Sequence, residues 1–138
     1  MLNLDEEKKQ ALLDKIDDGS FSSEDLDDYL ELFMEVCNES EDIEEEVDGW
    51  DRTFQIKMED KDDFYFMIEE CKFSVKKGTH EDPDITLEMS ADTAAGIFSG
   101  EIDATSAYMG GELKIIGPLP DAVKFRTLTE LVREELEE

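Results

Sequence analysis

The spacing of the apolar residues changes at Trp50, and this change limits most strongly what the chain can fold into. Between Leu26 and Cys37, apolar residues recur at intervals of three and four, which is the pattern of an amphipathic helix. From Phe54 to Met58 they alternate with polar residues, which is the pattern of a half-buried strand. The chain therefore places helices and strands in separate segments, and we predict an α+β protein.

The same two spacings assign the other elements. We expect strands at 53–58, 64–68, 71–75, 85–89 and 113–115. We expect helices at 4–17, 26–37, about 43–47, 91–98, 103–109 and from about 121 onward. Together they predict a five-stranded, mainly antiparallel sheet covered by helices. We expect one domain over 1–138, with acidic helices in 1–48, strands in 49–89, and short helices, a last strand and a C-terminal helix in 90–138.

Two details of the sheet also follow from the pattern. The strand at 113–115 comes after two helices, so we expect it to pair parallel with an earlier strand. The strand at 64–68 is apolar at every position, so we expect both of its faces to be covered.

The charge of the chain excludes several kinds of partner. There are 40 acidic residues against 13 basic ones, giving a net charge of −27. A surface with this much negative charge repels phosphate backbones and anionic bilayers. We therefore expect no nucleic-acid binding and no stable membrane attachment. Because 39% of the residues are hydrophobic and 12 are aromatic, we expect a folded core instead of an acidic disordered tail.

The sequence also indicates a compartment. No apolar stretch approaches the length of a membrane span, and the acidic start of the chain lacks the pattern of a signal peptide. Cys37 and Cys71 occupy apolar positions of their elements, so both are expected to be buried free thiols. These features favour a reducing, cytoplasmic location.

Catalytic signals are weak. The single histidine, His80, lies in a polar loop where a solvated side chain is expected. With 40 carboxylates in the chain, close pairs arise by chance, so their spacing does not indicate acid–base catalysis. We expect neither an enzyme nor a cofactor.

The segment 14–25 resembles a calcium-binding EF-hand loop. Asp14, Asp18 and Asp25 would be ligands, and Gly19 would form the sharp turn. Ile16 stands where a carboxylate or amide should bind, however, and Asp25 is shorter than the usual glutamate. A helix ended by Gly19 and a second helix capped by a serine is the favoured interpretation, and calcium binding is a weak alternative.

The segment 100–124 resembles the C-terminal half of the sterol carrier protein type 2 lipid-binding domain. That family has a glycine after a helix, a small residue and an aromatic in the next helix, a Leu-Lys-Ile strand between two glycines, and an Ala-x-Lys in the last helix. The matching residues, in order, are Gly100, Ser106, Ala107, Tyr108, Gly111, Leu113, Lys114, Ile115, Gly117, Ala122 and Lys124. The likeness extends with less specificity back to about Asp25, so the first helix is expected to be an extension.

The resemblance implies a sheet-and-helix fold with an apolar cavity between the layers. It implies binding of a hydrophobic small molecule or lipid, such as a sterol, a fatty acyl chain or an isoprenoid. The residues expected to line the cavity are Phe54, Phe66, Ile97, Phe98, Ile102, Tyr108, Met109, Leu113, Ile115, Phe125, Leu128 and Val132. Each of them is also suited to ordinary core packing.

Two functions therefore remain open. The favoured one is a non-enzymatic lipid carrier, and the other is an accessory module on the same fold, with a closed cavity and a protein partner. The oligomeric state and the chemical identity of the ligand are left open by the sequence.

Overall fold

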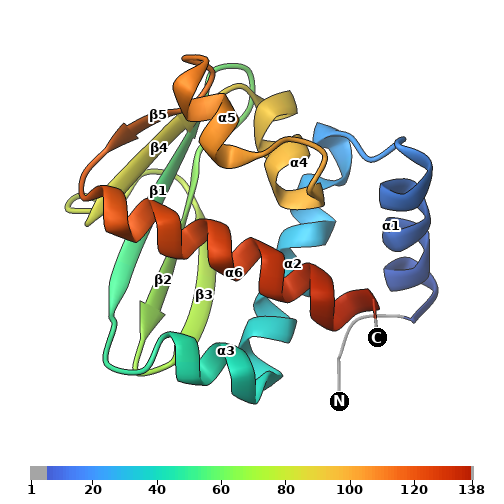
Figure 1. The fold of residues 1–138 in the computed structure, drawn as a ribbon, viewed down its shortest axis with the longest axis horizontal. Helices are drawn as coiled ribbons and strands as arrows, with labels where there is room; N and C mark the ends of the chain where they lie inside the picture. Colours follow the sequence, from blue (N-terminus) through green and yellow to red (C-terminus); the bar gives the residue numbers. More distant parts are fainter. Residues whose placement is uncertain (1–5, 138) are drawn as a thin grey trace.

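The fold is built on one five-stranded sheet with the strand order β3–β2–β1–β4–β5 (Figure 1). The structure is a computed structural model that describes residues 6–137. The strands are β1 (Arg52–Met58), β2 (Phe64–Glu69), β3 (Lys72–Lys77), β4 (Ile85–Met89) and β5 (Lys114–Ile116). Three of the four strand pairings are antiparallel, and β1 pairs parallel with β4. The predicted α+β class with a five-stranded, mainly antiparallel sheet is confirmed.

The helices precede, interrupt and follow the sheet. They are α1 (Glu6–Asp18), the 3-10 helix η1 (Ser23–Asp25), α2 (Leu26–Glu39), α3 (Glu41–Glu46), α4 (Ala91–Ser99), α5 (Ala104–Met109) and α6 (Leu119–Glu137). The apolar stripe of the first helix was expected to include Leu4, which lies outside the described residues. In the described part of α1, Leu12 is buried and Ala11 is exposed. The last helix begins two residues earlier than predicted because Pro120 is tolerated in a first helical turn.

The expected parallel pairing of the last strand is wrong. β5 pairs antiparallel with β4, with Leu87 opposite Ile115. Figure 1 shows the reason: α4 and α5 stay together at the end of the sheet where β4 finishes, so the chain re-enters the sheet from that same end. A parallel partner needs a crossover that returns to the opposite end. The chain forms its parallel pair earlier, when the loop after β3 carries it across to β4 beside β1.

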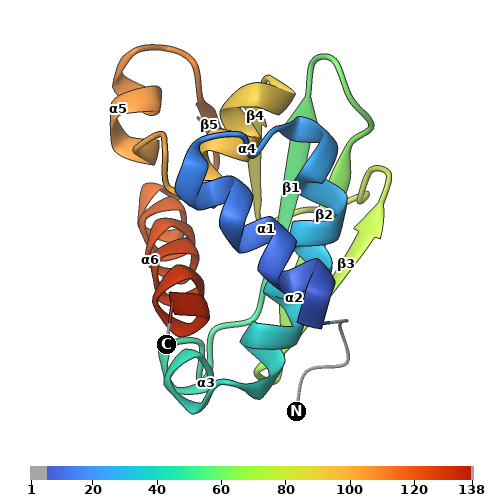
Figure 2. The same cartoon turned by 90° about the vertical axis from the view of Figure 1, so that its right-hand side faces the viewer.

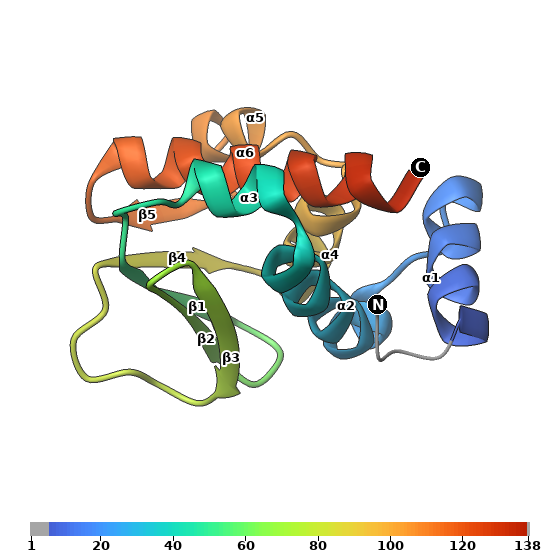
Figure 3. The same ribbon diagram turned by 90° about the horizontal axis from the view of Figure 1, so that it is seen from below.

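The helices cover one face of the sheet (Figure 3), so the expectation that β2 is covered on both faces is wrong. Phe64, Phe66 and Ile68 are buried under the helices, whereas Tyr65 and Met67 on the other face are half-buried. The loop after β3 partly shields this outer face. Its His80 ring lies 5.2 Å from the Tyr65 ring, and its backbone N–H donates to Gln55 Oε1 at 2.7 Å.

The two cysteines differ in their surroundings. Cys37 on α2 is buried as expected, and burial raises the pKa of its thiol. Cys71 is only half-buried, and it lies in the turn before β3 instead of in the strand. Glu70 and Cys71 both have positive φ, at 50° and 66°. Two such residues form the tight hairpin turn whose twist matches the flanking strands, and this moves the strand start to Lys72.

A column of aromatic rings fills the space between the sheet and the helices. Phe54 on β1 stacks on Phe66 on β2 with ring centroids 4.8 Å apart. Phe125 on α6 lies 5.6 Å from Phe54, and Phe98 on α4 lies 5.6 Å from Phe125. Phe33 on α2 continues the column at 5.5 Å from Phe98. The centre of the molecule is therefore close-packed.

The N-terminal helix α1 lies against the helical side of the molecule (Figure 2). Lys15 Nζ lies 2.6 Å from Asp25 Oδ1, and Lys8 Nζ lies 2.9 Å from Asp28 Oδ1 on α2. Leu12 is its one fully buried apolar side chain. Few apolar contacts and the ion pairs of Lys8 and Lys15 hold α1, so it is the least tightly packed of the long helices.

Candidate ligand-binding site

An apolar pocket of about 190 Å³ lies between β5, α5 and the first turns of α6. Its walls are almost entirely hydrocarbon, and Thr105, Tyr108 and Arg126 are the members whose side chains carry polar atoms. The lining residues are Leu87, Ala104, Thr105, Tyr108, Leu113, Ile115, Leu119, Ala122, Val123, Phe125 and Arg126. Such a lining binds apolar surface in preference to charged or strongly polar groups.

Asp103 fixes the helix that forms one wall of this pocket. Its carboxylate accepts hydrogen bonds from the Ser106 backbone N–H and hydroxyl, both at 3.1 Å, and so caps the start of α5. These bonds hold the pKa of Asp103 below its usual value. Arg126 Nε lies 3.3 Å from Asp103 Oδ1, which ties α5 to α6 across the pocket mouth.

Asp121 anchors the start of α6, which forms the opposite wall. This aspartate is buried, with an exposed fraction of 5%. It accepts hydrogen bonds from Arg52 Nε at 3.0 Å and from Trp50 Nε1 at 3.3 Å. A buried carboxylate needs such partners, so the pairing fixes the first turn of α6 against the start of β1.

Gly117 allows the sharp connection between β5 and α6. Its φ is +137°, and a Cβ there would approach Asp84 O and Ile85 Cα to 3.0 Å. The chain therefore passes close to the start of β4 before it turns into Leu119. This close approach places β5 and α6 at the angle that leaves the pocket between them.

Phe125 and Leu87 close the pocket on its inner side. Phe125 belongs both to the pocket lining and to the aromatic column of the core. The hollow therefore ends at this ring, and the space beyond it is occupied by Phe54, Phe66 and Phe98. Some of the residues predicted to line a long cavity therefore lie at the pocket, and others lie in the packed core.

Four of the predicted site residues line the pocket together: Tyr108, Leu113, Ile115 and Phe125. Six are buried in the core outside the pocket lining: Phe54, Phe66, Ile97, Phe98, Leu128 and Val132. Ile102 is half-buried and fits against Gly96, where a Cβ would meet its side chain. Met109 is 81% exposed, beside the pocket mouth on α5.

Seven lining residues lie outside the predicted set: Leu87, Ala104, Thr105, Leu119, Ala122, Val123 and Arg126. A signal for four of them is present in the sequence. Leu119, Ala122, Val123 and Arg126 follow the i, i+3, i+4, i+7 spacing and so form one face of α6. This face is distinct from the deeply buried one that carries Leu128 and Val132.

The carboxylates of the EF-hand-like segment have other partners. Asp14 accepts a hydrogen bond from the Gln10 side chain, and Asp18 accepts one from the Ser20 backbone N–H. Asp25 pairs with Lys15, and it accepts a hydrogen bond from the Ser22 backbone N–H at the start of η1. Asp25 is partly desolvated, which alone would raise its pKa. The bonds from Lys15 and Ser22 outweigh this and lower it. Within residues 6–137, no cluster of three or more His, Cys, Asp or Glu side chains is arranged to hold a metal ion.

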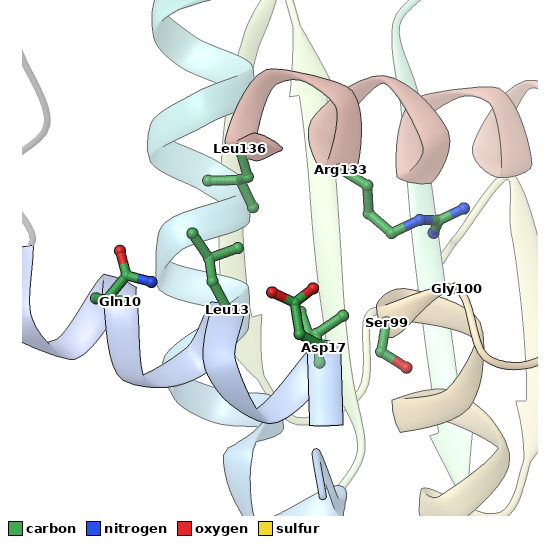
Figure 4. Close-up of a pocket in the computed structure, with 8 residues that line it drawn as sticks. Gln10, Leu13, Asp17, Ser99, Gly100, Arg133 and Leu136 are labelled. Atoms are coloured by element: carbon green, nitrogen blue, oxygen red, sulfur yellow. The ribbon is translucent and has the colours of Figure 1, made fainter. Parts of the chain in front are cut away.

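A second, larger hollow of about 550 Å³ lies between α1 and the ends of α4 and α6 (Figure 4). Leu13 and Leu136 face each other on one side of it, and Asp17, Ser99 and Arg133 make the other side polar. The Arg133 guanidinium donates to the carbonyls of Ile97 and Phe98 at 3.3 and 3.4 Å, and so caps the end of α4. Because its lining is mixed, this hollow is the less suitable of the two for an apolar ligand.

The comparisons with known proteins agree with this architecture. Residues 31–130 match the SCP-2 sterol transfer family. The chain belongs to this family. The matched region contains the sheet, α4, α5 and most of α6. Both the apolar pocket and the aromatic column behind it therefore lie inside this region. Helix α1 lies outside it, as expected for an N-terminal extension of the SCP-2 fold.

Solved structures of this fold share little sequence with the chain. A UbiJ-SCP2 ubiquinone synthesis protein is 16% identical with a TM-score of 0.60, over 80% of this chain and 90% of that one. Sterol carrier protein domain 2 of Helicoverpa armigera is 23% identical with a TM-score of 0.58, over 76% and 85%. A search of curated protein sequences gave no significant match.

The fold also occurs as part of a larger protein. The sec-alkylsulfatase Pisa1 from Pseudomonas sp. is 22% identical over 62% of this chain, with a TM-score of 0.56. The chain spans only 14% of that protein and 16% of its double mutant. No helix within residues 6–137 has the length and apolar character needed to cross a membrane.

Proposed function

We propose that this SCP-2 protein is a non-enzymatic carrier that binds the apolar part of a lipid in the pocket between β5, α5 and α6. The observation that carries the proposal is the lining of that pocket, which is hydrocarbon except for the polar atoms of Thr105, Tyr108 and Arg126. Membership of the sterol transfer family supports the same ligand class. Burial of apolar ligand surface contributes about 25 cal/mol per Å², so even a partly enclosed chain is held.

The pocket volume favours a chain end over a whole sterol. At about 190 Å³ it is smaller than the ~300–1,000 Å³ of typical ligand pockets. A bound acyl or isoprenoid chain therefore inserts its end and leaves the rest outside, unless the Phe125 ring moves. Phe125 is the natural point of extension because it lines the pocket and its ring also packs against the rings of Phe54 and Phe66.

Arg126 gives the mouth of the pocket its only charge within the lining. It is half-exposed and pairs with Asp103 and Glu130 on its outer side. Because two carboxylates already balance Arg126, a ligand with an uncharged, weakly polar head fits the mouth, and an apolar tail fits the interior. We propose that residues 1–138 act as one unit without a cofactor, in a reducing, cytoplasmic environment consistent with two free cysteines.

A second candidate is an accessory module with a closed cavity and a protein partner. The aromatic column favours it, because rings fill the interior where a long ligand tunnel would lie. The two candidates differ in one measurable property, which is whether a lipid occupies the pocket.

The deciding experiment is organic extraction and native mass spectrometry of the purified protein, followed by displacement of a fluorescent fatty acid. Ala122→Phe places a ring in the pocket and should abolish probe binding. Ala11→Phe adds the same ring on the exposed face of α1 and should leave probe binding unchanged. A wild-type protein with no extracted lipid and no probe binding would support the accessory module, and thermal unfolding checks that Ala122→Phe is folded.

A further inference from the structure

Helix α1 contacts the rest of the molecule through two different faces. The first face carries Lys8, Leu12 and Lys15, whose spacing of four and three residues places them on one stripe of the helix. Leu12 is buried, and the two lysines pair with Asp28 on α2 and Asp25 on η1. Both lysine side chains are partly exposed to water, which weakens such pairs. This face therefore holds α1 mainly through one leucine.

The second face of α1 borders the hollow of about 550 Å³ (Figure 4). It carries Gln10, Leu13 and Asp17, which follow the i, i+3, i+7 spacing of an adjoining stripe. Figure 4 shows Leu13 facing Leu136 of α6, whereas Gln10 and Asp17 are polar and exposed. Helix α1 therefore covers this part of the molecule without filling it, and it gives up the packing contacts that larger apolar side chains would make there.

The surface beneath α1 is acidic, and α1 balances only part of this charge. Residues 23–39, which form η1 and α2, hold seven acidic side chains and no basic one. Helix α1 brings three lysines but also five carboxylates, so its own net charge is −2. Arg133 is the one cation in the lining of the hollow, and it is turned toward the end of α4, which it caps. A helix with more cations and fewer carboxylates than α1 would be attracted more strongly to this surface.

The connection after α1 allows the helix to leave without disturbing the core. Gly19 and Ser20 are exposed, and Gly19 has a left-handed φ of 78°. Phe21 follows them and is buried against Tyr29, with ring centroids 5.4 Å apart. The core contact therefore lies on the α2 side of this short connection. Helix α1 also lies outside the family-matched region, which begins within α2.

We propose that α1 is a displaceable cover, and that the groove beneath it binds a basic amphipathic helix of a partner protein. The groove lies between α2 and the ends of α4 and α6. Two cations of the partner helix, seven residues apart, pair with Asp25 and Asp28, as Lys15 and Lys8 do in α1. Apolar side chains on its adjoining face fill the hollow against Leu136. This is helix-in-groove recognition, in which an apolar stripe supplies the contact area and flanking charges select the partner.

A second copy of the chain is a less suitable occupant of this groove. Exchange of α1 between two copies would restore the same imperfect packing and the same five carboxylates. It would also bring together two net charges of −27. The groove and the apolar pocket between β5, α5 and α6 share no lining residue, so this inference goes beyond the proposed lipid binding and does not depend on it.

The test uses the full chain and a fluorescein-labelled peptide of leucine and lysine, about 18 residues long, whose leucines form one helical stripe. A scrambled peptide of the same composition has the same charge without the stripe, and so measures attraction to the acidic surface alone. At about 0.15 M salt, the wild type should bind the striped peptide at least ~10-fold more tightly by fluorescence anisotropy. Amide hydrogen exchange in residues 6–18 should become faster in the complex, while exchange in the sheet stays unchanged.

Two pairs of substitutions change the hold of α1 in opposite directions. Lys8→Gln with Lys15→Gln removes both ion pairs, and should raise the affinity for the striped peptide relative to the scrambled one about 5-fold, because the groove is open more often. Gln10→Leu with Asp17→Leu fills the hollow from α1 itself and should lower the same ratio. Thermal unfolding checks that both variants are folded.

Two further variants serve as controls. Glu44→Gln with Glu45→Gln removes two charges from α3, outside the groove, and should leave the ratio unchanged. Ala122→Phe should also leave it unchanged, so failure of lipid binding and failure of helix binding are distinguishable. Equal binding of the striped and scrambled peptides would overturn the proposal, as would a complex in which exchange of residues 6–18 is not faster. A wild-type dimer in sedimentation that the peptide dissociates would assign the groove to exchange of α1 between two copies instead.

Discussion

Tyr29 carries a hydroxyl group that has no partner in the described structure. The side chain is fully buried on α2 among Phe21, Phe33 and Phe98. Its hydroxyl is the one buried side-chain polar atom of residues 6–137 without a hydrogen bond. Burial raises the pKa of this phenol, with the positive charge of Arg133 acting in the opposite direction. A buried donor without an acceptor lowers stability.

Removing this hydroxyl should therefore stabilise the protein. We expect Tyr29→Phe to raise the free energy of unfolding by about 1 kcal/mol, measured by urea denaturation. Tyr65→Phe is the control, since Tyr65 is half-buried on the outer face of the sheet and the change there should be within about 0.5 kcal/mol. A loss of stability in Tyr29→Phe would show that the hydroxyl has a partner, such as a bound water.

Phe125 separates the pocket from the core, so truncating it should have two effects. Phe125→Ala should lower the free energy of unfolding by about 3–5 kcal/mol, because the ring contacts Phe54, Phe66 and Phe98. It should also raise affinity for longer acyl chains relative to shorter ones, because the pocket then extends inward. Probe displacement with a series of chain lengths measures this ratio.

A matched control distinguishes opening of the pocket from general loosening. Phe33→Ala removes a ring from the same aromatic column at a point outside the pocket lining. It should destabilise the protein to a similar extent without changing the chain-length preference. Equal preferences in wild type and Phe125→Ala would show that the ring is not the inner wall for the ligand.

Helix α5 has six residues and depends on its cap to remain a pocket wall. Isolated helices of this length are unstable, so packing and capping must hold it. Asp103 supplies both the cap and the ion pair to Arg126 on α6. Loss of this side chain should therefore loosen the pocket more than it affects the sheet.

We expect Asp103→Ala to reduce probe affinity and thermal stability, and Asp103→Asn to retain most of both, because asparagine also caps helices. The pKa of Asp103 is lowered in the folded protein by its hydrogen bonds to Ser106. The ionised side chain therefore contributes its full stabilisation above 3.8, the pKa in the unfolded chain. This stabilisation is lost as pH falls through the lower pKa of the folded protein. The difference in free energy of unfolding between wild type and Asp103→Ala should be constant near neutral pH. It should vanish at pH values below the pKa of Asp103 in the folded protein. A difference that persists in strong acid would contradict this.

The overall charge should make stability depend on salt. A net charge of −27 on 138 residues repels itself, and salt screens the repulsion. We expect the melting temperature to rise as sodium chloride is increased toward about 1 M. Neutralising part of the acidic group on α3, with Glu44→Gln and Glu45→Gln, should raise the melting temperature at low salt and reduce the dependence on salt. An unchanged melting temperature across this range would show that the carboxylates are already balanced by local pairing.

The family resemblance and the caps were predictable because they are local. Gly19, expected to end the first helix, has a left-handed φ of 78°, and Ser22 caps the helical turn that follows it. The pocket was predicted only in part. Tyr108, Leu113, Ile115 and Phe125 share the lining, but periodicity could not show that Phe54, Phe66 and Phe98 would stack together and fill the space behind Phe125.

The sequence by itself determined the order of helices and strands, the buried face of α2, β1 and β4, and the concentration of charge in the N-terminal helices. These properties follow from the spacing of side chains along one element. The tertiary structure alone decided that β1 pairs parallel with β4, that β5 runs antiparallel, and that Tyr108, Leu119 and Val123 meet at one pocket while staying exposed. The physical reason is that pairing and packing depend on residues far apart in the chain, whereas a periodic pattern reports that a side chain is buried without specifying its neighbour.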